Sequence, residues 1–265
     1  MAAAASMAKA PLFVSWEMIG MNKGKPPSTS RRRCINVPRM PLLEIRDLRK
    51  SYRTPDGKVL TVLNVPGFEL EERQQMALRG SSGTGKTTLL HCIAGILSPD
   101  SGHLRLAGHD LPALSESFRD RVRAVNVGYI FQTFNLLQGY TCLENVVLGM
   151  SFGRGGEPRF ARTLLERVGL GDRLDYRPSQ LSVGQQQRVA VARALANKPK
   201  LVLADEPTGN LDPKNGQEAL KIIREICEEN SAALLLVSHD PAVLEQFEDC
   251  RDLAEINRAM QEEPA

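Results

Sequence analysis

Residues 80–88 read Gly-Ser-Ser-Gly-Thr-Gly-Lys-Thr-Thr and fit the pattern G-x-x-x-x-G-K-[ST]. Glycines let backbone N–H groups turn toward phosphate oxygens, and a helix that begins here directs its positive end at the same phosphates. Lys86 would add a full charge for the β- and γ-phosphates, and the Thr87 hydroxyl could ligate Mg²⁺. The sequence therefore predicts a nucleotide-phosphate site at Gly80, Ser81, Ser82, Gly83, Thr84, Gly85, Lys86, Thr87 and Thr88.

The segments on either side of this loop support that interpretation. Residues 75–78 read as a strand, and residues 87–97 carry leucine and isoleucine at helical spacing. The alternative is a chance glycine-rich turn. A strand before the glycines and an amphipathic helix after them favour the phosphate loop.

A second acidic element follows much later in the chain. Residues 201–204 are apolar and end in the adjacent carboxylates Asp205 and Glu206. Asp205 would hold Mg²⁺, and Glu206 would orient or deprotonate an attacking water. A surface acidic pair is the alternative, but the buried strand before it and its position after the phosphate loop favour the site.

The apolar segments predict the fold class. Residues 201–204 and 232–237 are apolar without alternation, as in parallel strands buried on both faces. Residues 42–48 and 59–63 read as strands joined by the turn signal Thr-Pro-Asp-Gly at 54–57. We expect an α/β P-loop NTPase: a mostly parallel sheet flanked by helices, an antiparallel β-subdomain and a helical subdomain inserted at about 133–195.

The expected ATP-binding domain covers residues 41–250, followed by a tail at 251–265. The acidic residues between 245 and 252 predict a solvated helix ending in a frayed terminus. The longest apolar run, residues 232–237, is too short to cross a bilayer, which takes about 20 residues.

Charge and cysteine content argue against several classes of protein and of binding site. The net charge of the chain is +3, and residues 1–40 carry a formal charge of +6, so the other 225 residues carry −3. Because this part of the chain is slightly acidic, we expect no nucleic-acid partner. The five cysteines are scattered without a CxxC pair, which argues against a disulfide framework or a zinc site. The basic, acid-poor residues 1–40 are typical of a plastid transit peptide; a disordered basic tail is the alternative.

Further motifs along the chain, in the expected order, resemble those of ABC-type ATPases. Residues 181–188, Leu-Ser-Val-Gly-Gln-Gln-Gln-Arg, resemble the family signature. Gln132 matches the Q-loop, Asp212 in Asn-Leu-Asp the D-loop, His239 the switch histidine and Tyr52 the aromatic residue that stacks on adenine. The resemblance covers residues 42–245.

The resemblance implies how these residues act. Ser182, Gly184 and Gln185 would face the γ-phosphate bound by a second ABC ATPase subunit, identical or related, so that two ATP molecules are held in a head-to-tail dimer. Gln132 would contact Mg²⁺ and the water, and His239 the γ-phosphate.

Three of these motif residues either have a second interpretation or differ from the family pattern. Asp212 would lie at the dimer interface, serve as a helix N-cap, or do both. Tyr52 is either the adenine platform or an ordinary half-buried tyrosine. Val183 replaces the usual first glycine of the signature, and it is tolerable if its backbone is helical or extended.

Residues 134–137, 141–146 and 209–212 resemble the ATPases of bacterial lipoprotein-release and macrolide-export systems, which act on separate transmembrane permease subunits. With residues 1–40, the chain resembles the plant ABC transporter I family, in the chloroplast stroma or on the stromal side of a membrane. Phe134, Leu136 and Leu137 are either subdomain core or a partner contact.

All the motif residues for Mg²⁺-dependent ATP hydrolysis are present, so we expect an active ATPase. Two alternatives to the transporter subunit stay open. One is a soluble ABC ATPase without transport, for example in iron–sulfur cluster assembly. The other is an ATP-dependent interaction switch with little turnover.

Overall fold

A five-stranded parallel sheet forms the centre of the computed structural model, which describes residues 40–153, 155 and 157–260. The strand order is β6-β7-β8-β3-β9, and every neighbouring pair is parallel. The strands are β3 (Gln75–Arg79), β6 (Val127–Ile130), β7 (Leu201–Asp205), β8 (Ala233–Ser238) and β9 (Asp249–Asp252). The predicted leader, residues 1–40, lies outside the described residues except for its last position.

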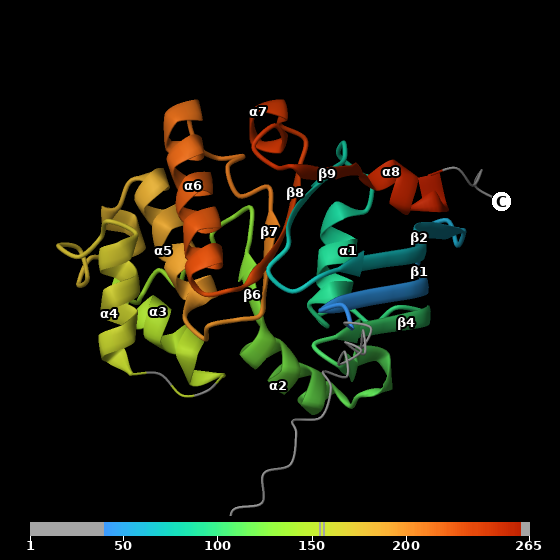
Figure 1. Cartoon of the computed structure of the whole chain (residues 1–265), viewed down its shortest axis with the longest axis horizontal. Coiled ribbons are helices and arrows are strands. Elements are labelled where there is room, and N and C mark those ends of the chain that lie inside the picture. The colour runs from blue at the N-terminus through green and yellow to red at the C-terminus, as the bar shows by residue number, and fades with distance from the viewer. Residues whose placement is uncertain (1–39, 154, 156, 261–265) are drawn as a thin grey trace, which may run out of the picture. The chain divides into compact units, whose positions relative to one another are not determined.

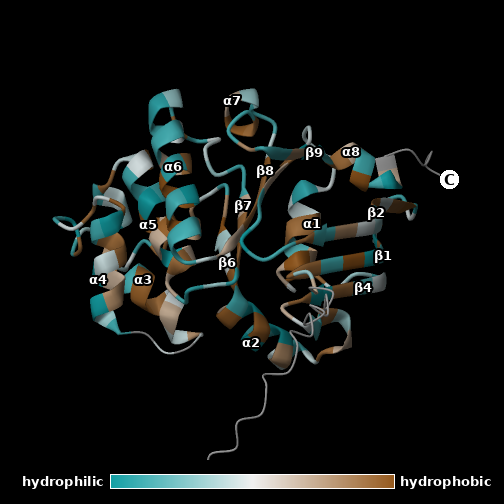
Figure 2. Cartoon of the chain, in the orientation of Figure 1, coloured by the Kyte–Doolittle hydropathy of each residue, from teal (hydrophilic) through white to brown (hydrophobic). Residues whose placement is uncertain are grey.

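Successive side chains of the central strands enter two different cores. On β7, Val202 and Ala204 pack with the helices on one face, whereas Leu201 and Leu203 pack with elements on the other face. The same alternation holds along β8. Figure 2 shows hydrophobic residues along β7 and β8. The lack of polar alternation in these segments thus reflects burial on both faces, which confirms the predicted parallel sheet.

A smaller antiparallel sheet in the order β2-β1-β4-β5 covers one side of this core with helix α1 (Figure 1). Its strands are β1 (Leu43–Arg53), β2 (Val59–Leu70), β4 (Ser101–Leu106) and β5 (His109–Asp110). The predicted turn joins β1 to β2, where the Gly57 N–H donates to the Thr54 carbonyl. Both strands run further than their apolar residues indicated.

Helix α1 (Lys86–Ile93) follows the glycine-rich loop but ends four residues before the predicted Leu97. Gly95 has a φ of 68°, and the N–H groups of Gly95 and Ile96 donate to Cys92 and His91 carbonyls. This left-handed glycine terminates the helix. Ile96 and Leu97, which extended the helical spacing of apolar residues in the sequence, belong to the turn after the helix.

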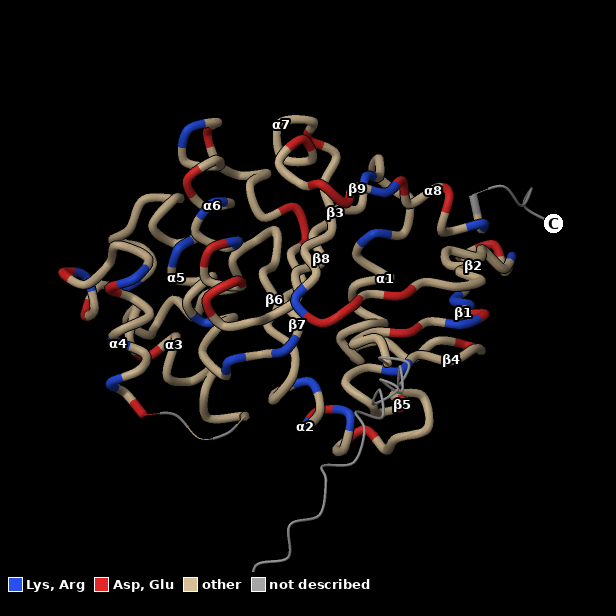
Figure 3. Tube along the Cα trace, in the orientation of Figure 1, with Lys and Arg blue, Asp and Glu red and all other residues tan. Residues whose placement is uncertain are grey.

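Helices cover the other face of the parallel sheet (Figure 1). Among the described residues of 133–195 there is no strand, which agrees with the predicted helical insertion. Arg167 donates to Glu225 at 3.0 Å and to Glu229 at 2.6 Å, so it connects α4 of the insertion to α6. Figure 3 shows charges of both signs on α4 and α6. The helices of this face are α3 (Cys142–Ser151), α4 (Pro158–Arg167), α5 (Val183–Leu195) and α6 (Pro213–Glu229). Helix α2 (Glu116–Asn126) instead packs through Val122 in the core that contains α1.

The solvated helix predicted across residues 245–252 is wrong. Asp249–Asp252 form β9 on the edge of the parallel sheet, between the short helices α7 (Pro241–Leu244) and α8 (Leu253–Ile256). Asp249 accepts a hydrogen bond from Gln74, and Asp252 caps α8 by accepting from the Ala254 N–H. The carboxylates that indicated a solvated helix therefore serve an edge strand and a helix cap.

Within the described residues, every helix is too short or too polar to cross a membrane.

The central sheet should dominate stability. Leu203→Ala would remove a side chain that is 0% exposed, at an expected cost of about 2–5 kcal/mol of unfolding free energy. Val59→Ala, at a side chain that is 59% exposed, should cost less than about 1 kcal/mol. Urea unfolding of both variants tests this, and equal costs would contradict the assignment of the core.

Candidate functional site

An open cavity of about 410 Å³ lies where β3, β7 and β8 end. Ligands of open parallel sheets bind at such carboxyl ends. Its lining combines the glycine-rich loop with side chains that follow the other two strands. The lining residues are Val62, Ser82, Gly83, Gly85, Lys86, Thr87, Thr88, Gln132, Asp205, Glu206 and His239.

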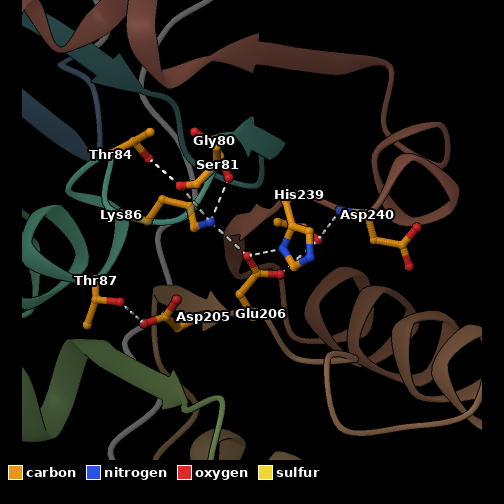
Figure 4. A network of polar contacts seen from close by, with 10 residues as sticks. Gly80, Ser81, Thr84, Lys86, Thr87, Asp205, Glu206, His239 and Asp240 are labelled. Carbon is orange, nitrogen blue, oxygen red and sulfur yellow. Dashed lines mark hydrogen bonds and ion pairs between the residues drawn. The ribbon is translucent and has the colours of Figure 1, made fainter. Parts of the chain in front are cut away.

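The loop at residues 80–85 is held in shape by its own polar groups (Figure 4). The Thr84 hydroxyl donates to the Ser81 carbonyl at 2.9 Å, and the Lys86 ammonium donates to the Gly80 carbonyl at 2.6 Å. A Cβ at Gly80 would lie 2.8 Å from the Thr84 hydroxyl, so a larger residue would force the Thr84 side chain to shift. Gly85 caps α1 with a φ of 89°, a conformation that favours glycine.

Lys86 and Glu206 form a buried ion pair at the bottom of the cavity. The Lys86 Nζ lies 2.9 Å from Glu206 Oε1, and the two residues are 9% and 6% exposed. His239 Nδ1 lies 2.7 Å from the same oxygen, while the Ser238 hydroxyl donates to Oε2 at 3.2 Å. Glu206 has a φ of +44°, so its carboxylate is placed by an unfavourable backbone conformation.

These contacts determine the charge state of Glu206. Burial raises the pKa of this carboxyl group, but hydrogen bonds from His239 and Lys86, with their charges, outweigh burial. The net pKa of Glu206 lies below its usual value. The carboxylate is therefore ionised at neutral pH and can accept a proton or a hydrogen bond from a water molecule.

Thr87 and Asp205 form the second polar cluster of the cavity. The Thr87 hydroxyl donates to Asp205 Oδ2 at 2.8 Å. Burial raises the pKa of Asp205, the Thr87 hydrogen bond lowers it, and the charge of Glu206 raises it further; the net shift is upward. A positive ion between these oxygens would favour the ionised form of Asp205.

Gln132 lines the same cavity, and its segment is held from two other elements. The Asn210 side chain donates to the Gln132 carbonyl at 2.6 Å. Arg193 on α5 donates to the carbonyls of Asn135 at 2.6 Å and Phe134 at 2.7 Å. The segment that follows Gln132 is thereby tied to α5.

The structure does not bring every predicted site residue to the cavity. Ser182, Gly184 and Gln185 lie at the start of α5, where Ser182 and Gln185 form a reciprocal capping box. Asp212 is the N-cap of α6, as one of its two predicted roles required. Tyr52 lies on β1, is 40% exposed and does not belong to the cavity lining.

Three residues that contact the site are not among the site residues predicted from the sequence. Val62 on β2 lines the cavity, Ser238 contacts Glu206, and Asn210 holds Gln132. Ser238 and Asn210 each lie within two residues of a predicted site residue, so their position offered a signal. Val62 offered none, because it is one apolar residue of a long strand.

A glycine-rich loop between a parallel strand and a helix, with carboxylates at the end of a neighbouring strand, is the arrangement of a P-loop nucleotide-binding protein. Residues 63–209 match the model of the ABC transporter family. The chain belongs to this family, which confirms the family resemblance of its motifs.

Curated relatives agree with the lipoprotein-release and macrolide-export resemblance. The lipoprotein-releasing system ATP-binding protein LolD of Shewanella oneidensis is 45% identical over 205 residues, 76% of this chain and 88% of LolD. The macrolide export ATP-binding/permease protein MacB of Syntrophobacter fumaroxidans is 44% identical over 209 residues. That match covers 77% of this chain but only 29% of MacB.

Solved structures share the fold. A dimeric structure of the ATP-binding cassette MJ0796, in a post-hydrolysis state with ADP and Pi, has a TM-score of 0.73 and 31% identity. It covers 79% of this chain and 93% of the MJ0796 chain. A second dimeric MJ0796 structure has the same TM-score at 32% identity. The predicted α/β fold class is confirmed.

The lowered pKa of Glu206 predicts a pH dependence of stability. The ionised form stabilises the fold above the usual carboxyl pKa of 4.5, and this stabilisation is lost as the pH falls through the lower folded value. The unfolding free energy of the native protein, measured against Glu206→Gln, should therefore stay level from neutral pH to about pH 5 and decline as the pH falls below 4.5. Urea titrations with the exposed Glu248→Gln as reference test this; a difference that grows on acidification would contradict it.

Proposed function

We propose that this chain is the ATP-hydrolysing subunit of a multi-subunit ABC transporter that dimerises around two Mg-ATP molecules. The observation that carries the proposal is the cavity itself, where Lys86, Asp205, Glu206, Gln132 and His239 converge. The start of α5, which carries the signature, lies outside that cavity. One chain therefore offers two half-sites, and a second copy or related subunit would complete each.

The residues beside the phosphate loop suit Mg²⁺. Mg²⁺ prefers oxygen ligands and usually takes one or two carboxylates together with substrate phosphates. The Thr87 hydroxyl and the Asp205 carboxylate are 2.8 Å apart and face the cavity with Gln132. Thr87, Asp205 and Gln132 would hold the ion, which when bound neutralises charge on the phosphates.

The remaining side chains would position the reactants. Lys86 would exchange Glu206 for the β- and γ-phosphates, since an ammonium binds the more highly charged partner more strongly. Glu206 would then orient the attacking water and accept its proton, with His239 fixing the carboxylate at one oxygen. Tyr52, on the strand next to β2, would stack on adenine beside Val62.

The partner's phosphates would meet the start of α5. Ser182, Gly184 and Gln185 surround the positive end of this helix, which suits an anion. Val183 is the first residue of α5 and is 48% exposed, so the valine keeps a helical backbone and its side chain has room. Asp212 would lie at the same interface.

Separate permease subunits would contact the segment after Gln132. Leu136 is 7% exposed and belongs to the core, whereas Leu137 and Tyr140 are 42% and 45% exposed. Arg193 links this segment to α5, so a permease contact here would be coupled to the signature helix. The names of LolD and MacB, which refer to lipoprotein release and macrolide export, support a transport role.

Two variants separate binding from hydrolysis. Glu206→Gln should retain Mg-ATP binding, lose turnover by at least about 100-fold, and accumulate an ATP-dependent dimer, because the general base is lost while the phosphate contacts remain. Lys86→Ala should weaken Mg-ATP binding and stay monomeric. Calorimetry, phosphate release and light scattering measure the three properties. Normal turnover in Glu206→Gln would contradict the assigned role.

The basic composition of residues 1–40 supports a plastid location, on or near the stromal side of a membrane. The full chain should be imported into isolated chloroplasts and shortened there. The imported Glu206→Gln protein, purified with Mg-ATP from solubilised chloroplast membranes, should carry a polytopic membrane protein with it. Adding Leu137→Asp to this variant should reduce the recovery of that membrane protein. Recovery of soluble partners alone would instead favour the non-transport ATPase.

A further inference from the structure

The segment after β9 returns to the phosphate loop. β9 pairs in parallel with β3, and Asp252 at its end lies opposite Arg79, the residue just before the loop. The chain then forms α8, in which Leu253 is fully buried and Ile256 packs against the same core. These apolar contacts fix the position of the next residue, Asn257.

Asn257 is 0% exposed, and its carboxamide makes four hydrogen bonds. Its Oδ1 accepts from the Asn64 N–H at 2.7 Å and the Ala259 N–H at 3.3 Å. Its Nδ2 donates to the Val62 carbonyl at 2.8 Å and the Thr84 carbonyl at 3.2 Å. Two donors and two acceptors are the full capacity of this side chain.

One of these partners lines the nucleotide cavity, and another belongs to the phosphate loop beside it. Val62 lines the cavity from β2, and Thr84 is in the phosphate loop. Between them lies Gly85, where an added Cβ would lie 3.0 Å from the Val62 carbonyl and 3.3 Å from Asn257 Nδ2. The carboxamide thus joins one wall of the cavity to the loop that begins α1.

We infer that Asn257 is a positioning residue, through which the C-terminal segment holds the phosphate loop against β2 and thereby sets the affinity for nucleotide. It acts through Thr84 and Val62 rather than by touching the nucleotide. It lies beyond residues 63–209, which match the family model. The inference rests on the proposed nucleotide site and adds an element to it.

The full 265-residue chain carrying Asn257→Ala tests the inference. Loss of the donors to Val62 and Thr84 frees the loop, so the Kd for Mg-ATP should rise about tenfold, a typical effect of losing buried hydrogen bonds. Asn145→Ala is a matched control. Asn145 is also 0% exposed and its side chain also makes four hydrogen bonds, but in the helical insertion. It should lower the melting temperature while leaving the Kd within twofold.

Calorimetry at a temperature where all variants are folded measures the Kd, and thermal unfolding without nucleotide measures stability. Asn257→Asp replaces the donor with a carboxylate oxygen that faces two carbonyls, so its Kd should rise at least as much; it decides the question if Asn257→Ala does not fold. A native Kd in the folded variant, or equal increases for the Asn257 and Asn145 variants, would overturn the inference. Failure of the native chain to bind Mg-ATP would instead overturn the proposed function.

Discussion

The buried pair of Lys86 and Glu206 is the interaction on which the site depends. A buried ammonium and a buried carboxylate each require a partner, and here the glycine-rich loop and the end of β7 supply one to the other at 2.9 Å. Ser238, the last residue of β8, and His239, which follows it, hold the same carboxylate. In our proposal, phosphates replace Glu206 as the partner of Lys86. Nucleotide binding and the release of Glu206 for catalysis are then one event.

The fold holds these groups in place because the central strands are buried on both faces. β3, β7 and β8 are adjacent and parallel, so the segments that follow them meet at one edge. The helical insertion is tied to this edge through backbone carbonyls: Gln187 on α5 donates to the Pro207 carbonyl at 2.7 Å, immediately after Glu206. A movement of α5, which carries the signature, would therefore displace the strand-end carboxylates, as an ATP-driven switch requires.

Local patterns predicted three of the five central strands, β3, β7 and β8, and most of the cavity, but neither β6 nor β9. Lys86, Thr87, Asp205 and Glu206 could be assigned because each directly follows or begins an element with a clear apolar pattern. The C-terminal segment could not be predicted, since its acidic residues are equally typical of a solvated helix. The role of Asn257 could not be predicted either, because its partner Val62 is 195 residues away in the sequence. The positive φ of Glu206 depends on the tertiary structure, and sequence gives no sign of it.

The central claim is that a complete hydrolytic site needs two chains, since the phosphate loop and the signature of one chain do not share a cavity. The most direct test is the ATPase activity per chain, measured with Mg-ATP from nanomolar to high micromolar protein, with the mass determined at each concentration. We expect the activity per chain to rise with concentration and to level off as the dimer forms. A constant activity per chain across a range in which the protein stays monomeric would contradict the account.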